Sequence, residues 1–130
     1  MYFKDFEAWN TLKKRVETDG LPRNIRTGEV RWTTFGVNIG SEIDGKGFSF
    51  ARPAVILHPI GHTLALVVPL STKIKDADGY FPVDFQGTKI SVCIHQMKVI
   101  SMKRILDRKG KMPDSTISCI KDQIKKFFGF

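Results

Sequence analysis

The sequence predicts a mainly β protein of the α+β class, in which a small antiparallel β-barrel is preceded and followed by an amphipathic helix. Three observations support this prediction. Several short apolar or alternating segments lie between residues 28 and 106 and are separated by turn residues, as in small barrels. Apolar side chains recur at helical spacing on both sides of this region. The chain of 130 residues is long enough for one core, so we expect a single domain over 1–130.

The first predicted element is an amphipathic helix over residues 3–17. Phe3, Phe6 and Trp9 recur at helical spacing, with basic residues around the rest of the cylinder. The segment Asp19-Gly20-Leu21-Pro22 ends the helix, because glycine suits the C-cap and proline cannot continue the hydrogen-bond ladder. We expect residues 1–22 to form a helical extension that covers an edge of the barrel.

The barrel, predicted over residues 28–106, is organised around two apolar segments within residues 50–72. Each segment is rich in β-branched residues and bounded by turn residues, which is typical of a core strand. Arg52 stands at the start of the first segment, and Ser71 and Thr72 stand at the end of the second. Because antiparallel neighbours run in opposite directions, Arg52 and Ser71 should lie close together. A permanently charged guanidinium beside a hydroxyl favours an oxyanion site.

The other barrel elements follow from the same patterns. A strand with an interruption near Thr34 is expected over residues 29–38, and a mobile glycine-rich loop over residues 38–50. Further short strands are predicted at residues 80–85, 89–94 and 99–105, the last of which ends in a turn.

The last predicted element is a helix from Asp114 to Phe128, within the C-terminal segment 113–130. Its buried stripe is expected to contain Ile117, Ile120, Ile124 and Phe127. Both tryptophans, Trp9 and Trp32, are expected in the core, and so are the thiols of Cys93 and Cys119.

The composition favours a polyanionic partner. Twenty-one Lys and Arg residues against thirteen Asp and Glu residues give a formal charge of +8. On a small surface, this charge attracts nucleic acid or an acidic protein segment. No apolar run approaches the ~20 residues needed to cross a bilayer, and the N-terminus lacks the pattern of a signal peptide. We therefore expect a cytoplasmic protein with no membrane partner.

Five short motifs resemble, in order and spacing, the MazF/PemK family of toxin endoribonucleases. They are Gly28-Glu29-Val30, Gly40-Ser41-Glu42, Arg52-Pro53-Ala54-Val55-Ile56, Val68-Pro69-Leu70-Ser71-Thr72 and Gln96-x-Lys98 followed by Ile100-Ser101. The resemblance implies an SH3-like barrel of the MazF/CcdB-like kind and a toxin of a type II toxin–antitoxin system. It further implies a sequence-specific endoribonuclease, or mRNA interferase, that cleaves single-stranded RNA without a metal or other cofactor. By the same analogy the protein is a homodimer that a cognate antitoxin protein inhibits.

The implied chemistry assigns roles to individual residues. RNA carries its own nucleophile, so the enzyme need only position the 2′-hydroxyl, stabilise the developing charge and transfer two protons. Arg52 would contact the scissile phosphate. Ser71 stands where the family usually has Thr and is expected to supply a hydroxyl to the same phosphate, with Thr72 directly after it as the alternative. His95 stands where many members have an acidic residue, and it is either a proton shuttle or a strand-end histidine. The expected RNA contacts are Asn38, Glu42, Lys46, Phe48, Lys73, Gln96 and Lys98.

The sequence argues against two other kinds of site. Residues 40–46 match the first seven positions of a P-loop, but Gly47 replaces the hydroxyl residue that binds Mg²⁺, which argues against nucleotide hydrolysis. His58 and His62 are separated by a proline and a glycine, which prevents the helical alignment of a zinc-binding pair. Two alternatives stay open: a non-catalytic RNA-binding module, and a toxin of the same fold that poisons a topoisomerase.

Overall fold

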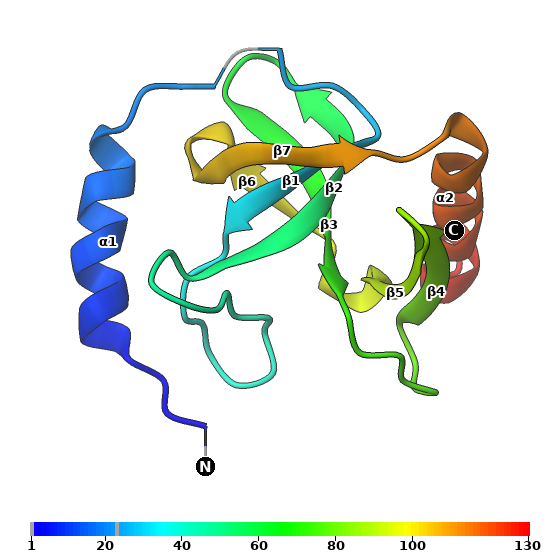
Figure 1. Ribbon diagram of the computed structural model, residues 1–130, viewed down its shortest axis with the longest axis horizontal. Coiled ribbons are helices and arrows are strands. Elements are labelled where there is room, and N and C mark those ends of the chain that lie inside the picture. Colours follow the sequence, from blue (N-terminus) through cyan, green and yellow to red (C-terminus); the bar gives the residue numbers. More distant parts are fainter. Residues whose placement is uncertain (1, 23) are drawn as a thin grey trace.

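The computed structural model describes residues 2–22 and 24–130 and has the α+β architecture that the sequence predicts (Figure 1). Its helices are α1 (Phe6–Thr18), α2 (Asp114–Phe128) and the short 3-10 helices η1 (Ile94–Gln96) and η2 (Met102–Arg104). Its strands are β1 (Glu29–Thr34), β2 (Ala51–Ile60), β3 (Leu64–Ser71), β4 (Tyr80–Phe85), β5 (Thr88–Cys93), β6 (Lys98–Ser101) and β7 (Ile105–Lys111). No helix in the described part of the chain is long and apolar enough to cross a membrane.

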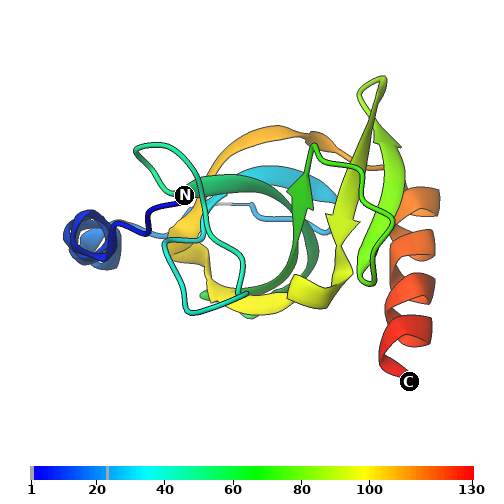
Figure 2. The same cartoon turned by 90° about the horizontal axis from the view of Figure 1, so that it is seen from below.

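The strands form one curled antiparallel sheet. Its main hydrogen-bonded path runs β4-β5-β3-β2-β1-β7. β3 changes partner along its length, since its first half pairs with β6 and its end pairs with β5. Figure 2 shows the sheet end on, curled around an interior. Among residues 2–22 and 24–130 no pairing joins the two ends of the path, so the predicted barrel is a curled sheet that stays open.

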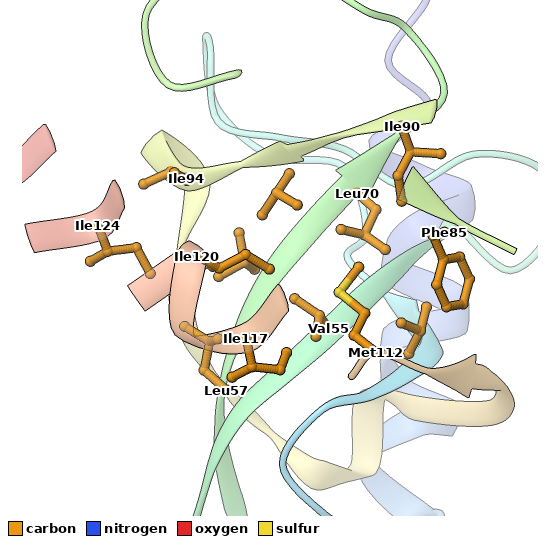
Figure 3. Close-up of a cluster of buried hydrophobic side chains, with 13 residues drawn as sticks. Val55, Leu57, Leu70, Phe85, Ile90, Ile94, Met112, Ile117, Ile120 and Ile124 are labelled. Atoms are coloured by element: carbon orange, nitrogen blue, oxygen red, sulfur yellow. The ribbon is translucent and has the colours of Figure 1, made fainter. Parts of the chain in front are cut away.

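The central strands β2 and β3 bury both of their faces, which explains their nearly continuous apolar sequence. One face belongs to a core that α2 covers (Figure 3), made up mainly of Val55, Leu57, Val68, Leu70, Val92, Met112, Ile117, Ile120 and Ile124. The other face belongs to the interior of the curled sheet, made up of Phe35, Ala54, Ile56, Ala65, Val67, Ile100, Met102 and Ile105. The two strands are therefore fixed from both sides.

The sequence patterns do not predict β7. Of its seven residues only Ile105 is buried, because β7 lies at the edge of the sheet beside β1. An edge strand buries little apolar surface and tolerates charged side chains, so it shows no alternation that could be recognised. β7 continues the sheet to Lys111, beyond the barrel end expected at residue 106.

The helix α2 has the predicted bounds, and its isoleucines Ile117, Ile120 and Ile124 are buried. The prediction that Phe127 is buried is wrong, since this side chain is 43% exposed and stacks edge-on against Phe128. Cys119 is exposed as well, although it was expected in the core. Cys119 lies on the exposed side of the helix, and Phe127 lies near its end, where it lines a surface cavity with Tyr80 and Phe81 of β4.

The helix α1 stands beside the sheet, on the side opposite α2 (Figure 1). Asp5 caps its start by accepting a hydrogen bond of 2.9 Å from the amide of Ala8. Trp9 is the only buried residue of this helix, whereas Phe3 and Phe6 are exposed. The predicted apolar stripe therefore does not pack as a whole, and a single aromatic side chain anchors the helix.

Candidate functional site

The antiparallel register of β2 and β3 brings Arg52 and Ser71 to the same place. Ala54 pairs with Pro69 and Val55 with Val68, and the same register two residues further on aligns position 52 with position 71. Both side chains line one cavity of about 260 Å³. Its remaining lining residues are Ser41, Ile43, Lys46, Lys73, Lys75, Tyr80, Cys93, His95 and Gln96.

The cavity is strongly cationic. Lys46 from the 38–50 loop, Arg52 from β2, and Lys73 and Lys75 from the segment after β3 all line it. None of the described residues that line it is Asp or Glu. A concave surface with one sign of charge concentrates ligands of the opposite sign, so this cavity suits a phosphate group.

The Arg52 side chain is oriented by the 38–50 loop. Its Nε atom donates a hydrogen bond to the backbone carbonyl of Asp44, and the side chain is partly buried. Because a guanidinium carries five donors in a rigid fork, this bond leaves the Nη donors available to an anion in the cavity.

The structure distinguishes the two candidate hydroxyls. Ser71 lines the cationic cavity, and its Oγ accepts a 3.2 Å hydrogen bond from the backbone amide of Lys73, as in a serine turn. The carbonyl of Lys73 in turn accepts a 2.7 Å bond from the hydroxyl of Ser91. Thr72 is exposed and lines a different, neighbouring cavity. Ser71 is thus the hydroxyl beside Arg52 in the cationic cavity.

His95 lies on η1 and also lines the cationic cavity. Its ring lies 4.8 Å from the Tyr80 ring, and it packs so closely on Gly79 that any side chain there would overlap it. The Nδ1 atom is buried and has no hydrogen-bond partner among the described residues. No hydrogen bond to this ring is found among the described residues, so its packing against Tyr80 and Gly79 holds it, and the burial of Nδ1 carries a cost.

Five of the lining residues were not predicted as site residues: Ser41, Ile43, Lys75, Tyr80 and Cys93. Tyr80 forms part of the wall, and the ammonium of Lys75 lies 5.2 Å from the centre of its ring. Cys93 contributes a buried thiol, and burial raises the pKa of this thiol above its usual value, so it stays protonated at neutral pH. The positions of Lys75 and Tyr80 depend on how the segment after β3 folds back, which no spacing in the sequence reports.

Gln96 holds the 38–50 loop against the cavity. Its Oε1 accepts a 3.0 Å hydrogen bond from the amide of Ile43, and its Nε2 donates a 2.9 Å bond to the carbonyl of Ser41. In this state both ends of the amide are occupied by the loop backbone. Its expected contact with a base edge stays a prediction that requires these two bonds to open.

The other predicted RNA contacts lie in or near this loop. The side chain of Asn38 donates to the carbonyls of Phe35 and Ile43, at 3.0 and 2.7 Å, so it shapes the loop from within. Glu42 is exposed and accepts a 3.3 Å bond from an amide of its own loop, and Phe48 is fully exposed. Lys98 lies outside the cavity lining, where burial and the charge of Arg104 lower its pKa.

A second cavity of about 410 Å³ adjoins the first and shares Lys46, Arg52 and Ser71 with it. Its walls are largely apolar and include Trp32, Pro53, Leu70, Phe85 and Ile90. The expectation that Trp32 belongs to the core is wrong, because its side chain is 40% exposed at this cavity, with Lys109 5.5 Å above its ring. Trp32 pairs with Pro53, next to Arg52, so the β1–β2 register could have identified it.

A protein-family model decides what kind of protein this is. The model of the PemK-like, MazF-like toxin of type II toxin–antitoxin systems matches residues 26–128. The chain belongs to this family. The resemblance seen in the sequence motifs is thereby confirmed, and the match includes the whole sheet and all of α2.

Solved structures share the fold of this PemK/MazF-like toxin. A MazF structure from Deinococcus radiodurans is 18% identical, with a TM-score of 0.65, and the match covers 86% of this chain and 100% of that one. The Mycobacterium tuberculosis toxin MazF-mt6 is 16% identical, with a TM-score of 0.58 and coverages of 78% and 97%. A mycobacterial endoribonuclease solved with its cognate antitoxin is 13% identical, with a TM-score of 0.60 and coverages of 82% and 97%. No curated protein matches.

Proposed function

We propose that this PemK/MazF-like toxin is a metal-independent endoribonuclease that cleaves single-stranded RNA. One observation carries the proposal: Arg52, Ser71 and His95 line a single cavity together with three lysines, and none of the described lining residues is acidic. A charged fork can stabilise the developing charge, a hydroxyl can donate a hydrogen bond to the phosphate, and an imidazole can transfer protons, which together would assist attack by the 2′-hydroxyl of RNA.

In the proposed reaction the 2′-oxygen attacks the adjacent phosphorus while the bond from phosphorus to the 5′-oxygen breaks. The 2′-hydroxyl gives up its proton, and the leaving 5′-oxygen takes one up. The products are a 2′,3′-cyclic phosphate, which can open to a 3′-phosphate, and a 5′-hydroxyl. RNA supplies the nucleophile, so the protein has to align the groups and stabilise charge.

Each side chain has one role in this scheme. The Nη donors of Arg52 stabilise the negative charge that builds up on the phosphate oxygens, and such a donor contributes about 3 kcal/mol. The role of Arg52 is therefore electrostatic, and it takes no part in proton transfer. His95 supplies an imidazole, which can accept a proton at one ring nitrogen and donate one, and it is the proposed proton shuttle. Ser71 donates a hydrogen bond to the same phosphate.

The adjoining cavity suits an unpaired nucleobase. Trp32 offers an exposed aromatic face beside Arg52, and stacking on such a face contributes about 1–3 kcal/mol for each base. Bases in a duplex are not free to stack in this way, so the pair of cavities favours single-stranded RNA. The apolar cavity then holds a base while the cationic cavity holds the phosphate next to it.

We further propose a homodimer and a cognate antitoxin as partners. Mycobacterial and Deinococcus relatives have been solved as complexes with an antitoxin, the latter named as MazE–MazF. The formal charge of +8 favours an acidic partner segment, which would compete with RNA for the cationic cavity.

The test is cleavage of a long single-stranded RNA by the purified protein in excess chelator, followed by mapping of the cut ends. Arg52→Ala should lower the cleavage rate by about 100-fold, the equivalent of about 3 kcal/mol. Arg15→Ala removes the same charge from the exposed face of α1 and should cleave normally. Specific cuts with 5′-hydroxyl ends that disappear only in Arg52→Ala support the proposal.

Intact RNA after incubation with antitoxin-free wild-type protein would overturn the nuclease proposal. The dependence of RNA affinity on salt would then separate the remaining alternatives. An RNA-binding module binds RNA with a steep salt dependence, whereas a topoisomerase poison has no need to bind it.

A further inference from the structure

The residues before α1 are bonded to the loop that orients Arg52. We call residues 2–5 the N-terminal arm; Figures 1 and 2 both show this segment beside the 38–50 loop. The Tyr2 hydroxyl donates a 3.0 Å hydrogen bond to Oδ2 of Asp44. The ammonium of Lys4 donates to the carbonyls of Asn38 and Gly40, at 2.7 and 3.0 Å, and lies 3.7 Å from the Asp44 carboxylate. The arm is thus hydrogen-bonded to the loop at Asn38, Gly40 and Asp44.

The helix that follows fixes the arm in place. Trp9 is buried, and its ring lies 5.8 Å from the ring of Phe50 at the end of the loop. Gly36, just before the loop, has a φ of +80°, and a Cβ there would overlap the Trp9 ring. The guanidinium of Arg104 lies on the same ring, 5.6 Å from its centre. α1 is therefore anchored beside both ends of the loop, which keeps the arm within reach of Asp44.

Asp44 connects the arm to the cationic cavity. Oδ2 of its carboxylate accepts the hydrogen bond from the Tyr2 hydroxyl and lies 3.7 Å from the Lys4 ammonium. Oδ1 accepts a 2.6 Å hydrogen bond from the backbone amide of Asn38. Its backbone carbonyl accepts the hydrogen bond from Nε of Arg52. Asp44 itself is only 9% exposed, whereas the Tyr2 side chain that donates to it is 65% exposed, so this bond is partly buried. The position of the arm is thereby transmitted through one residue to Arg52.

We propose that the N-terminal arm is a clamp that positions Arg52, with Tyr2 and Lys4 acting as positioning residues through Asp44. The arm lies outside residues 26–128, which the family model matches, so the inference rests on contacts made in this chain. It also rests on the proposed nuclease function, since the guanidinium it orients is the one that contacts the phosphate. Without the clamp the loop still closes through Gln96, but the Asp44 carbonyl no longer holds Arg52 in one orientation.

The test compares the full chain with the double variant Tyr2→Phe/Lys4→Met. Tyr2→Phe removes one hydroxyl, and Lys4→Met keeps the length of the side chain while it removes the ammonium. Lys14→Met is the matched control, because it removes the same charge from an exposed position of α1. The single variant Lys4→Arg keeps the charge and the hydrogen-bond donors, so it should keep most of the wild-type proton exchange and kcat. The readouts are NMR solvent exchange of the Arg52 Nε–H and the Asn38 amide, and kcat and KM for RNA cleavage.

In the double variant we expect the protons of the Arg52 Nε–H and the Asn38 amide to exchange with solvent about tenfold faster than in the wild type. The kcat for RNA cleavage should be about tenfold lower, and KM should stay within threefold of the wild-type value. Loss of kcat without a change in KM is the signature of misplaced catalytic geometry. Unchanged exchange at Arg52 would overturn the clamp, and so would faster exchange with normal kcat. A raised KM with unchanged exchange would mean that Lys4 binds RNA directly. If the wild type cleaves no RNA, the nuclease proposal fails, and faster exchange at Arg52 still decides whether the arm holds it.

Discussion

Replacing Gln96 by alanine should loosen the 38–50 loop without disturbing the sheet. Gln96 makes two hydrogen bonds to the loop backbone, of 3.0 Å from the amide of Ile43 and 2.9 Å to the carbonyl of Ser41. A hydrogen bond contributes about 0.5–1.5 kcal/mol net, and the bond to Ser41 is exposed to solvent and belongs at the lower end. The two together hold the loop closed by about 1.5 kcal/mol, which corresponds to about a tenfold change in the opening equilibrium.

Amide hydrogen exchange at Ile43 measures this opening directly, because its N–H is the donor to Gln96. We expect exchange to be about tenfold faster in Gln96→Ala, with the amides of Val55 and Val67 in the core strands unchanged. Gln96→Glu keeps the acceptor for Ile43 but puts an oxygen opposite the Ser41 carbonyl, so it should give an intermediate rate.

Gln123→Ala on α2 is the control for the loss of a glutamine elsewhere. Unchanged exchange at Ile43 in Gln96→Ala would refute the reasoning, because the loop would then be held by other contacts alone. A rise in KM for RNA with no change in exchange would instead assign Gln96 to base recognition.

Three further predictions concern the hydroxyl, the helix anchor and the buried thiol. Ser71→Ala should slow RNA cleavage by at least tenfold and Thr72→Ala should have a smaller effect, because only Ser71 lines the cavity with His95; equal losses would contradict this assignment. Gly36→Ala should lower the free energy of unfolding, measured with urea, by about 1–3 kcal/mol, because the φ of Gly36 is +80° and the new methyl group overlaps Trp9. An unchanged free energy of unfolding would show that α1 is not anchored at Gly36. Burial raises the pKa of the Cys93 thiol above its usual value of 9.0, so the thiol loses its proton at a lower pH in the unfolded state than in the folded state. The free energy of unfolding should therefore fall as pH rises above about 9, and it should fall less in Cys93→Ala.

The sequence predicts those parts of the site that depend on neighbouring strands. Arg52 and Ser71 end up together because two adjacent apolar strands with a short turn have one sensible antiparallel arrangement, and this arrangement fixes which ends meet. α2 was predictable for a similar reason, since its isoleucines follow the helical period closely.

Parts that depend on distant contacts were not predictable in the same way. Gln96 bonds to backbone atoms of Ser41 and Ile43. Because these backbone groups are the same in every residue except proline, the residue types do not show which of them a side chain will contact. β7 carries charged residues because it is an edge, so its pairing with β1 is visible only in three dimensions. α1 shows a helical pattern of aromatic residues, but the number that become buried depends on the surface it meets, which accommodates Trp9 alone.

The candidate site combines a rigid support with an adjustable one. Arg52 and Ser71 stand at the ends of β2 and β3, which are packed on both faces, so their backbones cannot shift without disturbing two cores. The 38–50 loop contributes Lys46 and the carbonyl that orients Arg52, yet it is held by hydrogen bonds from Gln96 on one side and from Tyr2 and Lys4 on the other. Hydrogen bonds near the surface can open without unfolding the core. Substitutions in these loop contacts should therefore change the rate and selectivity of the site at little cost in stability, whereas substitutions in the two cores should change stability first.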